Sequence, residues 1–332
     1  MTCTPDDNRR GRRASAAIWS ALLVGLLLFM VFGRVPDHTL FWDDVYHFGH
    51  VPLFGMVAIS ILGLFDARGE TLDQPRPWWL AFALAIVLGG CTEFLQLFQS
   101  GRDASFWHFL RDVAGAGSFL LVAATLRWKD RFAGPIRSAG GRALAWTGVL
   151  LMLSAAGFNL ATTVAMYGER DKAFPTLFAL DGSWWERPFI ETEHSVLTPR
   201  ARPPHMALPL DEPLARLDLE PGRYPGVAFD EPYPDWRGAG SLVLTFVSDL
   251  DVPLHLTLRV NDASHDNRFK DRFNRALLIR PGLNRIVIPL DQVRRAPARR
   301  EMDMRHIRRI MLFGYRVTEP THVYLGPLRL GD

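Results

Sequence analysis

The chain has 332 residues, of which 48% are hydrophobic, and a formal net charge of +3. Its mean hydropathy of +0.03 averages two unlike halves, because long apolar runs fill the chain up to about Met166 and charged residues, proline and short alternating segments follow. The arginines lie beside apolar runs or among acidic residues, which argues against a nucleic-acid partner, and two cysteines, Cys3 and Cys91, exclude a disulfide framework.

Five apolar stretches are long enough to cross a hydrocarbon layer of roughly 30 Å as helices of about 20 residues. They are residues 16–32, 48–65, 78–98, 113–128 and 143–166, and the second and fourth are short. The first stretch follows a basic N-terminus and has no convincing small-residue cleavage site after it. We therefore interpret it as an uncleaved membrane anchor.

Basic residues favour the cytoplasmic side of a membrane. They flank the loop between the fourth and fifth stretches, at Arg127, Lys129, Arg131, Arg137 and Arg142. That loop and the basic N-terminus then share the inner side, and five crossings leave the C-terminal half outside. We expect a cytoplasmic tail over residues 1–15, a membrane domain over 16–166 and a periplasmic or extracellular domain over 167–332, in a bacterial inner membrane.

Polar residues recur where the apolar stretches begin and end. Asp43 and His47 form a D-x-x-x-H pattern, Glu93 and Gln96 form E-x-x-Q, and R-x-x-S follows at residues 102–105. Ionisable groups at such depths are energetically costly and tend to be functional. The topology predicted above sends all of them to the outer face.

In order and placement, these motifs resemble the VanZ-like family of small polytopic envelope proteins. The positions that match are Asp43, His47, Glu93, Gln96, Arg102, Ser105 and Gly115. Three positions depart from the family pattern, where Asp44 replaces Lys, His108 replaces Asp and Asp112 replaces Asn. The resemblance covers about the first third of the chain. It implies a cell-envelope protein related to glycopeptide resistance, and it implies no particular reaction.

We expect these residues to bind a lipid-linked or otherwise amphiphilic envelope ligand. The predicted set is Asp43, His47, Glu93, Gln96, Arg102, Ser105, His108 and Asp112. The planar guanidinium of Arg102 suits a phosphate or carboxylate, and it or His47 is the expected partner of Glu93. One alternative is a polar network that only fixes helix packing.

A second alternative is a membrane-embedded hydrolase or transferase acting on an envelope lipid or lipid-linked sugar. Glu93 and His47 would then be its catalytic acid and base. We assign no metal and no cofactor, because the chain has no dense ligand motif such as H-E-x-x-H.

Short segments with period-two alternation follow Met166. They are residues 242–247, 254–260, 276–279, 285–290, 307–313 and 322–330. Alternation bounded by Asp, Asn, Gly and Pro predicts half-buried antiparallel strands. The expected fold class is therefore multi-domain, with an α-helical transmembrane bundle of about five helices followed by an all-β, jelly-roll-like sandwich.

The segment 254–290 resembles galactose-binding-like jelly rolls and related carbohydrate-binding modules, through its strand rhythm and the turn Pro281-Gly282-Leu283-Asn284. This resemblance implies a non-catalytic domain that binds an envelope glycan. Aromatic rings can cover sugar faces while polar side chains bind hydroxyl groups. The candidates are Trp184, Trp236, Asn261, Asp262 and His265. The alternative is that both tryptophans are core residues and that 261–275 is an ordinary polar loop.

Overall fold

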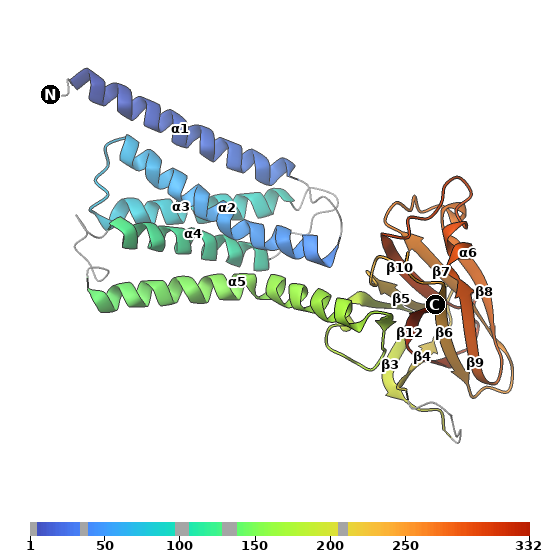
Figure 1. Cartoon of the computed structure of the whole chain (residues 1–332). Helices are drawn as coiled ribbons and strands as arrows, with labels where there is room; N and C mark the ends of the chain where they lie inside the picture. The colour runs from blue at the N-terminus through green and yellow to red at the C-terminus, as the bar shows by residue number, and fades with distance from the viewer. Residues whose placement is uncertain (1–4, 34–38, 97–105, 128–137, 205–211) are drawn as a thin grey trace. The chain divides into compact units, whose positions relative to one another are not determined.

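The computed structural model describes residues 5–33, 39–96, 106–127, 138–204 and 212–332 (Figure 1). Its contacts divide the chain into two compact units, Met1–Val164 and Ala165–Asp332. We call them the helical unit and the β unit and describe each by itself.

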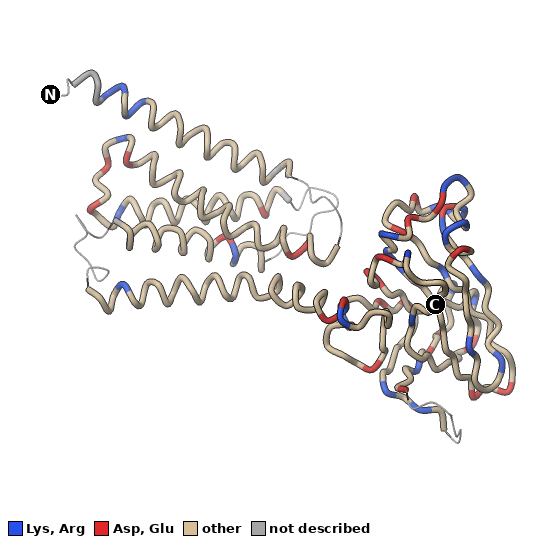
Figure 2. The backbone as a smooth tube through the Cα atoms, viewed as in Figure 1, with Lys and Arg blue, Asp and Glu red and all other residues tan. Residues whose placement is uncertain are grey.

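Long apolar helices make up the helical unit. They are α1 (Pro5–Phe32), α2 (Leu40–Ala67), α3 (Pro75–Gln96), α4 (Phe106–Arg127) and α5 (Ala139–Ala173), whose last turns belong to the β unit. Each of the five contains a segment long and apolar enough to cross a membrane, by length and composition. Figure 2 shows that charged residues occupy few positions along them. The helical part of the predicted fold class is confirmed.

The helices α2 and α4 begin earlier than the apolar stretches predicted. Hydropathy placed their starts at residues 48 and 113, whereas the helices begin at Leu40 and Phe106. The first turn of α2 is capped by Thr39, whose side-chain oxygen accepts a hydrogen bond of 3.1 Å from the Trp42 amide. The additional turns carry histidines and carboxylates that interact between helices, and hydropathy alone treats such residues as helix ends.

Small residues bring α2 and α4 close together. Gly55 faces the ring of Phe119, and Gly115 lies against the backbone of Val51, so a side chain at either glycine would collide. Ala116 and Val57 beside them are fully buried. Small residues at these positions allow the two helices to pack closely along their contact.

The β unit consists of two antiparallel sheets. A seven-stranded sheet has the order β1-β12-β6-β11-β4-β3, with β9 also paired to β6, and a five-stranded sheet has the order β2-β5-β10-β7-β8. The strands are β1 (Thr176–Phe178), β2 (Ile190–Glu193), β3 (Ser195–Ala201), β4 (Leu214–Leu219), β5 (Gly226–Asp230), β6 (Ser241–Ser248), β7 (Leu254–Asp262), β8 (Phe273–Ile279), β9 (Gly282–Pro289), β10 (Ile307–Phe313), β11 (Thr321–Leu325) and β12 (Leu328–Gly331). The predicted all-β sandwich is confirmed.

Alternating side chains from the strands form the core of the β unit. In β10, Ile310 and Leu312 are fully buried while the residues between them are half-buried on the other face. Strong alternation predicted this strand at its observed bounds. The predicted segment 322–330 is two strands, because Gly326 and Pro327 interrupt it and Pro lacks the N–H that a continuous ladder needs.

A buried carboxylate holds the chain at the entry to the β unit. The side chain of Glu186 accepts hydrogen bonds from the backbone amides of Ala179 and Leu180, and the residue is 1% exposed. Burial raises the pKa of Glu186 to about 7, although the two amide hydrogen bonds act in the opposite direction. The folded state therefore favours the protonated form more than the unfolded state does.

We expect Glu186 to make the β unit less stable as the pH rises. Its folded pKa of about 7 lies above the unfolded value of 4.5, so the stability that the proton provides is present below pH 4.5 and is lost through pH 7. The difference corresponds to about 3 kcal/mol. The substitution Glu186→Gln should flatten the decline of the thermal midpoint between pH 5 and pH 8, measured by tryptophan fluorescence of the whole chain in detergent.

The exposed Glu220→Gln serves as the control and should leave the pH dependence as in the unmodified protein. Identical pH slopes for Glu186→Gln and the unmodified chain would contradict this account.

Candidate functional site

Polar side chains gather inside the helical unit, where α2, α3 and α4 meet. We call this group the helical cluster. It consists of Asp44, His47, His50, Glu93, His108 and Asp112. Five of the six have less than 10% of their surface exposed, namely Asp44, His50, Glu93, His108 and Asp112, and Asp112 is fully buried. Burial of so many polar groups is costly unless they interact with one another or with a ligand.

The tightest contact in the helical cluster joins α2 to α4. His50 Nδ1 lies 2.8 Å from Asp112 Oδ1. The ring of His108 contacts the rings of both His47 and His50, tilted against the first at a centroid distance of 4.6 Å and stacked on the second at 5.1 Å. Three imidazoles therefore lie close together, and His108 contacts the other two.

Glu93 lies close to a histidine that the sequence analysis did not pair with it. Its Oε1 lies 3.7 Å from His108 Nδ1. His108 reaches Glu93 because one helix turn separates it from Asp112 on the face of α4 that packs against α2 and α3. Arg102 lies outside the described residues, so the pairing of Glu93 with Arg102 or His47 stays a prediction.

The carboxylate of α2 that enters the cluster is Asp44. It is buried, accepts a hydrogen bond of 2.5 Å from Thr163 Oγ1 on α5, and lies 3.8 Å from His47 Nδ1. The prediction had placed Asp43 in the site, and this residue is exposed. The helical repeat explains the difference, because Asp44 and His47 are three residues apart and share a face.

Two of the predicted ligand-binding residues, Arg102 and Ser105, lie outside the described residues, as does the side chain of Gln96. Their roles stay predictions.

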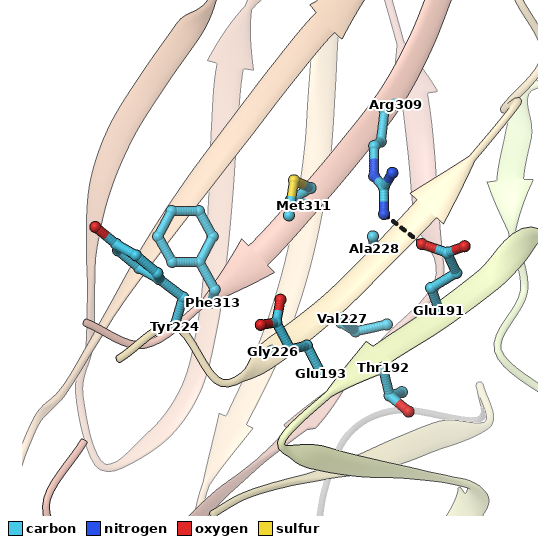
Figure 3. Close-up of a pocket in the computed structure, with 10 residues that line it drawn as sticks. All are labelled: Glu191, Thr192, Glu193, Tyr224, Gly226, Val227, Ala228, Arg309, Met311 and Phe313. Atoms are coloured by element: carbon cyan, nitrogen blue, oxygen red, sulfur yellow. Dashed lines mark hydrogen bonds and ion pairs between the residues drawn. The ribbon is translucent and has the colours of Figure 1, made fainter. Parts of the chain in front are cut away.

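A pocket of about 440 Å³ lies on the outer face of the five-stranded sheet (Figure 3). It extends over the adjacent strands β2, β5 and β10 and is lined by Glu191, Thr192, Glu193, Tyr224, Gly226, Val227, Ala228, Arg309, Met311 and Phe313. We call it the sheet pocket.

Strand register explains why the sheet is hollow there. Ala228 on the central strand β5 pairs with Glu191 on one side and Met311 on the other, and Gly226 pairs with Glu193 and Phe313. On the central strand, Ala228 has only a methyl group and Gly226 has no side chain, whereas the residues paired with them on β2 and β10 have long side chains. The result is a trough between two walls.

The walls of the sheet pocket carry charge and aromatic rings. Arg309 Nη2 donates to Glu191 Oε2 at 2.5 Å, and its Nε lies 3.1 Å from Asp230 Oδ1. Burial raises the pKa of Asp230 to about 6, against the effect of the Arg309 guanidinium. At the other end, the exposed ring of Tyr224 contacts Phe313 edge-to-face at 5.7 Å.

Sequence reasoning missed most of this pocket, although the alternation of β10 contained a signal. Residues 309, 311 and 313 share the face opposite the buried Ile310 and Leu312, which placed an arginine and an aromatic ring on the outside. β2 is four residues long and its pairing with β5 could not be derived from the sequence.

The two predicted tryptophans differ in position. Trp236 is 1% exposed and donates from Nε1 to the Tyr233 carbonyl at 2.8 Å, so its assignment to glycan binding is corrected to a core residue. Trp184 is 55% exposed, but it does not line the sheet pocket.

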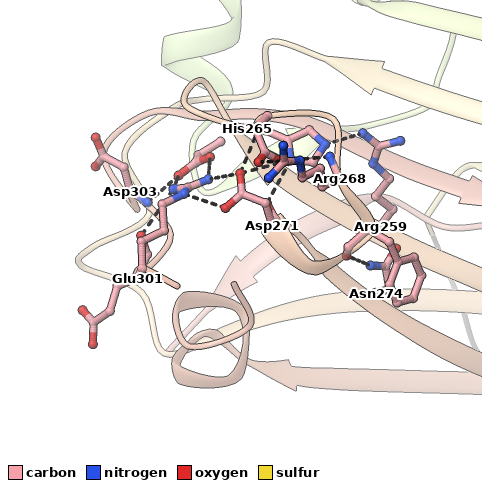
Figure 4. Close-up of polar contacts among 11 residues, drawn as sticks. Arg259, His265, Arg268, Asp271, Asn274, Glu301 and Asp303 are labelled. Atoms are coloured by element: carbon pink, nitrogen blue, oxygen red, sulfur yellow. Dashed lines mark hydrogen bonds and ion pairs between the residues drawn. The ribbon is translucent and has the colours of Figure 1, made fainter. Parts of the chain in front are cut away.

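Residues of the predicted polar loop form an internal network (Figure 4). Arg300 binds both oxygens of the buried Asp262, at 2.5 and 2.7 Å, and also both oxygens of Asp271. His265 has both ring nitrogens engaged, one accepting from Arg259 at 3.0 Å and the other donating to the Asp271 carbonyl at 2.9 Å. Asp262 and His265 are thus engaged within the chain, and their role in glycan binding stays a prediction.

Asn261 is 6% exposed, so it is also poorly placed to contact a polymer. Five arginines of the C-terminal Arg-rich run form ion pairs, namely Arg294, Arg295, Arg300, Arg308 and Arg309. Most of the positive charge in this run is therefore compensated within the described part of the β unit.

No protein-family model matches the chain, and no curated protein matches its sequence. The β unit is similar to solved structures. One is a family 11 carbohydrate-binding module from Clostridium thermocellum in complex with a β-1,3-1,4-mixed-linked tetrasaccharide, with 11% identity over 47% of this chain and 94% of that chain and a TM-score of 0.36. Another is an exo-β-agarase, with 16% identity over 47% of this chain and 25% of that chain and a TM-score of 0.36.

A family 30 carbohydrate-binding module of a cellulosomal cellulase from Clostridium thermocellum has 12% identity over 47% of this chain and 92% of that chain, with a TM-score of 0.31. These values describe a distant likeness in strand arrangement.

We expect the Arg300 network to be essential for the stability of the β unit. Arg300→Met keeps the aliphatic stem but leaves the fully buried Asp262 carboxylate without its counter-charge. Removing one partner of such a pair costs about 3 kcal/mol or more. The urea midpoint of the β unit, followed by tryptophan fluorescence in the whole chain, should fall accordingly.

Arg299→Met is the matched control, because no ion pair of Arg299 is present in the described structure. Equal urea midpoints for the two variants would show that Asp262 does not depend on Arg300.

Proposed function

We propose that this chain is an integral inner-membrane protein of the bacterial cell envelope whose external β unit binds glycan in the sheet pocket. One observation carries the proposal: an exposed tyrosine ring, two carboxylates and a guanidinium line one trough on a rigid sheet.

Each wall group matches a part of a sugar. The C–H face of a pyranose ring packs on an aromatic ring such as Tyr224, while carboxylates accept hydrogen bonds from hydroxyl groups and Arg309 donates to ring or hydroxyl oxygens. A volume of about 440 Å³ falls within the usual range for small-molecule sites. Because the lining residues lie on paired strands, little conformational entropy is lost on binding.

The charge of the sheet pocket favours neutral or amine-bearing glycans. Glu191, Glu193 and Asp230 stand against the single guanidinium of Arg309, and Arg309 is held by two of these carboxylates. An acidic polysaccharide would bring further negative charge to this surface, where like-charge contacts are unfavourable.

The helical unit would anchor this glycan-binding domain and hold an amphiphilic ligand of its own. The buried helical cluster supports this part, since buried ionisable groups between apolar helices mark binding or transport sites. A lipid-linked sugar is a suitable ligand, with its headgroup at the cluster. The motif resemblance to VanZ-like proteins supports the same compartment.

We expect Tyr224→Ala to weaken glycan binding about tenfold, which corresponds to about 1.4 kcal/mol from a lost stacking contact. The measurement is isothermal titration of the whole chain in detergent with soluble oligosaccharides from neutral β-glucans, amino-sugar polymers and acidic polysaccharides. Neutral or amino-sugar ligands should bind, and acidic ones should not.

Trp184→Ala is the matched control, because it removes an exposed aromatic ring outside the sheet pocket. Its affinity should equal that of the unmodified chain. If Trp184→Ala abolishes binding and Tyr224→Ala does not, the glycan site lies elsewhere on the β unit. A folded chain that binds none of the three classes would refute glycan binding.

We expect the β unit to face the cell exterior. In a chain without Cys3 and Cys91, the exposed turn position Val252→Cys should react with a membrane-impermeant maleimide in intact spheroplasts, whereas Gly140→Cys at the start of α5 should react only after lysis. This outcome follows from five crossings and basic inner loops. The opposite labelling pattern would show that the topology is inverted.

A further inference from the structure

Three side chains of the helical cluster converge from three helices. His50 on α2, Glu93 on α3 and His108 on α4 each offer a ligand atom of the kind that holds a metal ion, and these atoms lie within 4.8 Å of one another. Two imidazoles and one carboxylate are a ligand set that zinc and iron accept in proteins.

The distance between Glu93 and His108 fits an intervening ion. Oε1 and Nδ1 are 3.7 Å apart, which is too long for a hydrogen bond. Two ligand atoms bound to one tetrahedral zinc, with bonds of about 2.0–2.2 Å, are separated by about 3.4 Å. Small side-chain rotations would bring all three ligand atoms to such distances.

His108 has an unsatisfied atom directed into this space. Its Nδ1 is buried and has no hydrogen-bond partner among the described residues, and the whole side chain is 10% exposed. Leaving such a nitrogen unpaired in a dry interior costs about 1–3 kcal/mol. A bound cation would satisfy it.

His50 is oriented as metal-binding histidines usually are. Its Nδ1 is held by Asp112 Oδ1 at 2.8 Å, and the Asp112 side chain is fully buried. A carboxylate in this position fixes the tautomer and the ring orientation of a ligating histidine, and Nε2 stays available for the ion.

A second group of histidine and carboxylate side chains, in the β unit, can be compared with this one. His265, Asp266 and Asp271 in the β unit also lie within ligand distance of one another. There, both ring nitrogens of His265 are hydrogen-bonded and Arg300 occupies both oxygens of Asp271. The β-unit group has its polar atoms engaged without a metal, whereas His108 Nδ1 on α4 has no hydrogen-bond partner among the described residues.

We propose that His50, Glu93 and His108 bind one divalent transition-metal ion, with zinc as the ion that fits best, and that Asp112 positions His50 for it. The ion completes the polar interior of the helical unit and presents an open coordination position to water or to an oxyanion such as a headgroup phosphate. Metal binding is independent of the glycan proposal, because it involves a different unit of the chain.

The test uses the whole chain in detergent, stripped of metal with a chelator and titrated with Co²⁺, whose visible absorption reports nitrogen and oxygen coordination in a low-symmetry site. We expect one Co²⁺ per chain, displaced by Zn²⁺. His108→Ala and Glu93→Gln should each lower the affinity at least 100-fold, and Asp112→Asn should lower it about 10- to 100-fold because it acts through His50.

Glu70→Gln is the matched control, since it makes the same change at an exposed residue of the helical unit that lies outside the helical cluster. It should bind Co²⁺ as the unmodified chain does. Size-exclusion elution and the thermal midpoint check folding, and the near-isosteric Glu93→Gln keeps the test decisive if His108→Ala does not fold. A stripped chain without the Co²⁺ absorption, or equal binding in folded Glu93→Gln, would overturn the proposal.

Discussion

The helical unit depends on one constraint: a polar group between apolar helices must find a partner on another helix. The contact of His50 with Asp112 meets this requirement between α2 and α4, and Asp44 with Thr163 meets it between α2 and α5. Both contacts are specific in direction and distance, whereas apolar packing in lipid has little directional preference. The polar cluster therefore sets the register of the helices as well as the position of any ligand.

Close packing and polar pairing support each other at this point. Gly115 lets α4 approach the backbone of α2, and Asp112 lies one turn before it on the same helix. A bulkier residue at 115 would separate the helices and lengthen the His50–Asp112 contact. Gly115 and the buried His50–Asp112 pair thus hold α2 and α4 together. A metal ion bound by His108 and Glu93 would join α3 to them.

The β unit shows how similar side chains can serve stability or binding. Around Arg300, one guanidinium binds the carboxylates of Asp262 and Asp271 and ties three segments of the β unit together. In the sheet pocket, Arg309 is also paired, but Glu193 and Tyr224 stand at the edge of a trough and face solvent. Composition is alike in the two places. In the sheet pocket, small residues on the central strand β5 keep the trough open between its walls.

The sequence by itself determined the two-part architecture, because membrane-length apolar runs and period-two alternation are local properties of a chain. Alternation found β10 at its observed bounds, and apolar length found all five long helices. The sequence alone could not show which of Asp43 and Asp44 faces inward, that Trp236 lies in the core, or that Glu93 contacts His108. Those outcomes depend on helix phase, strand register and partners far apart in the chain, and only the tertiary structure brings these together.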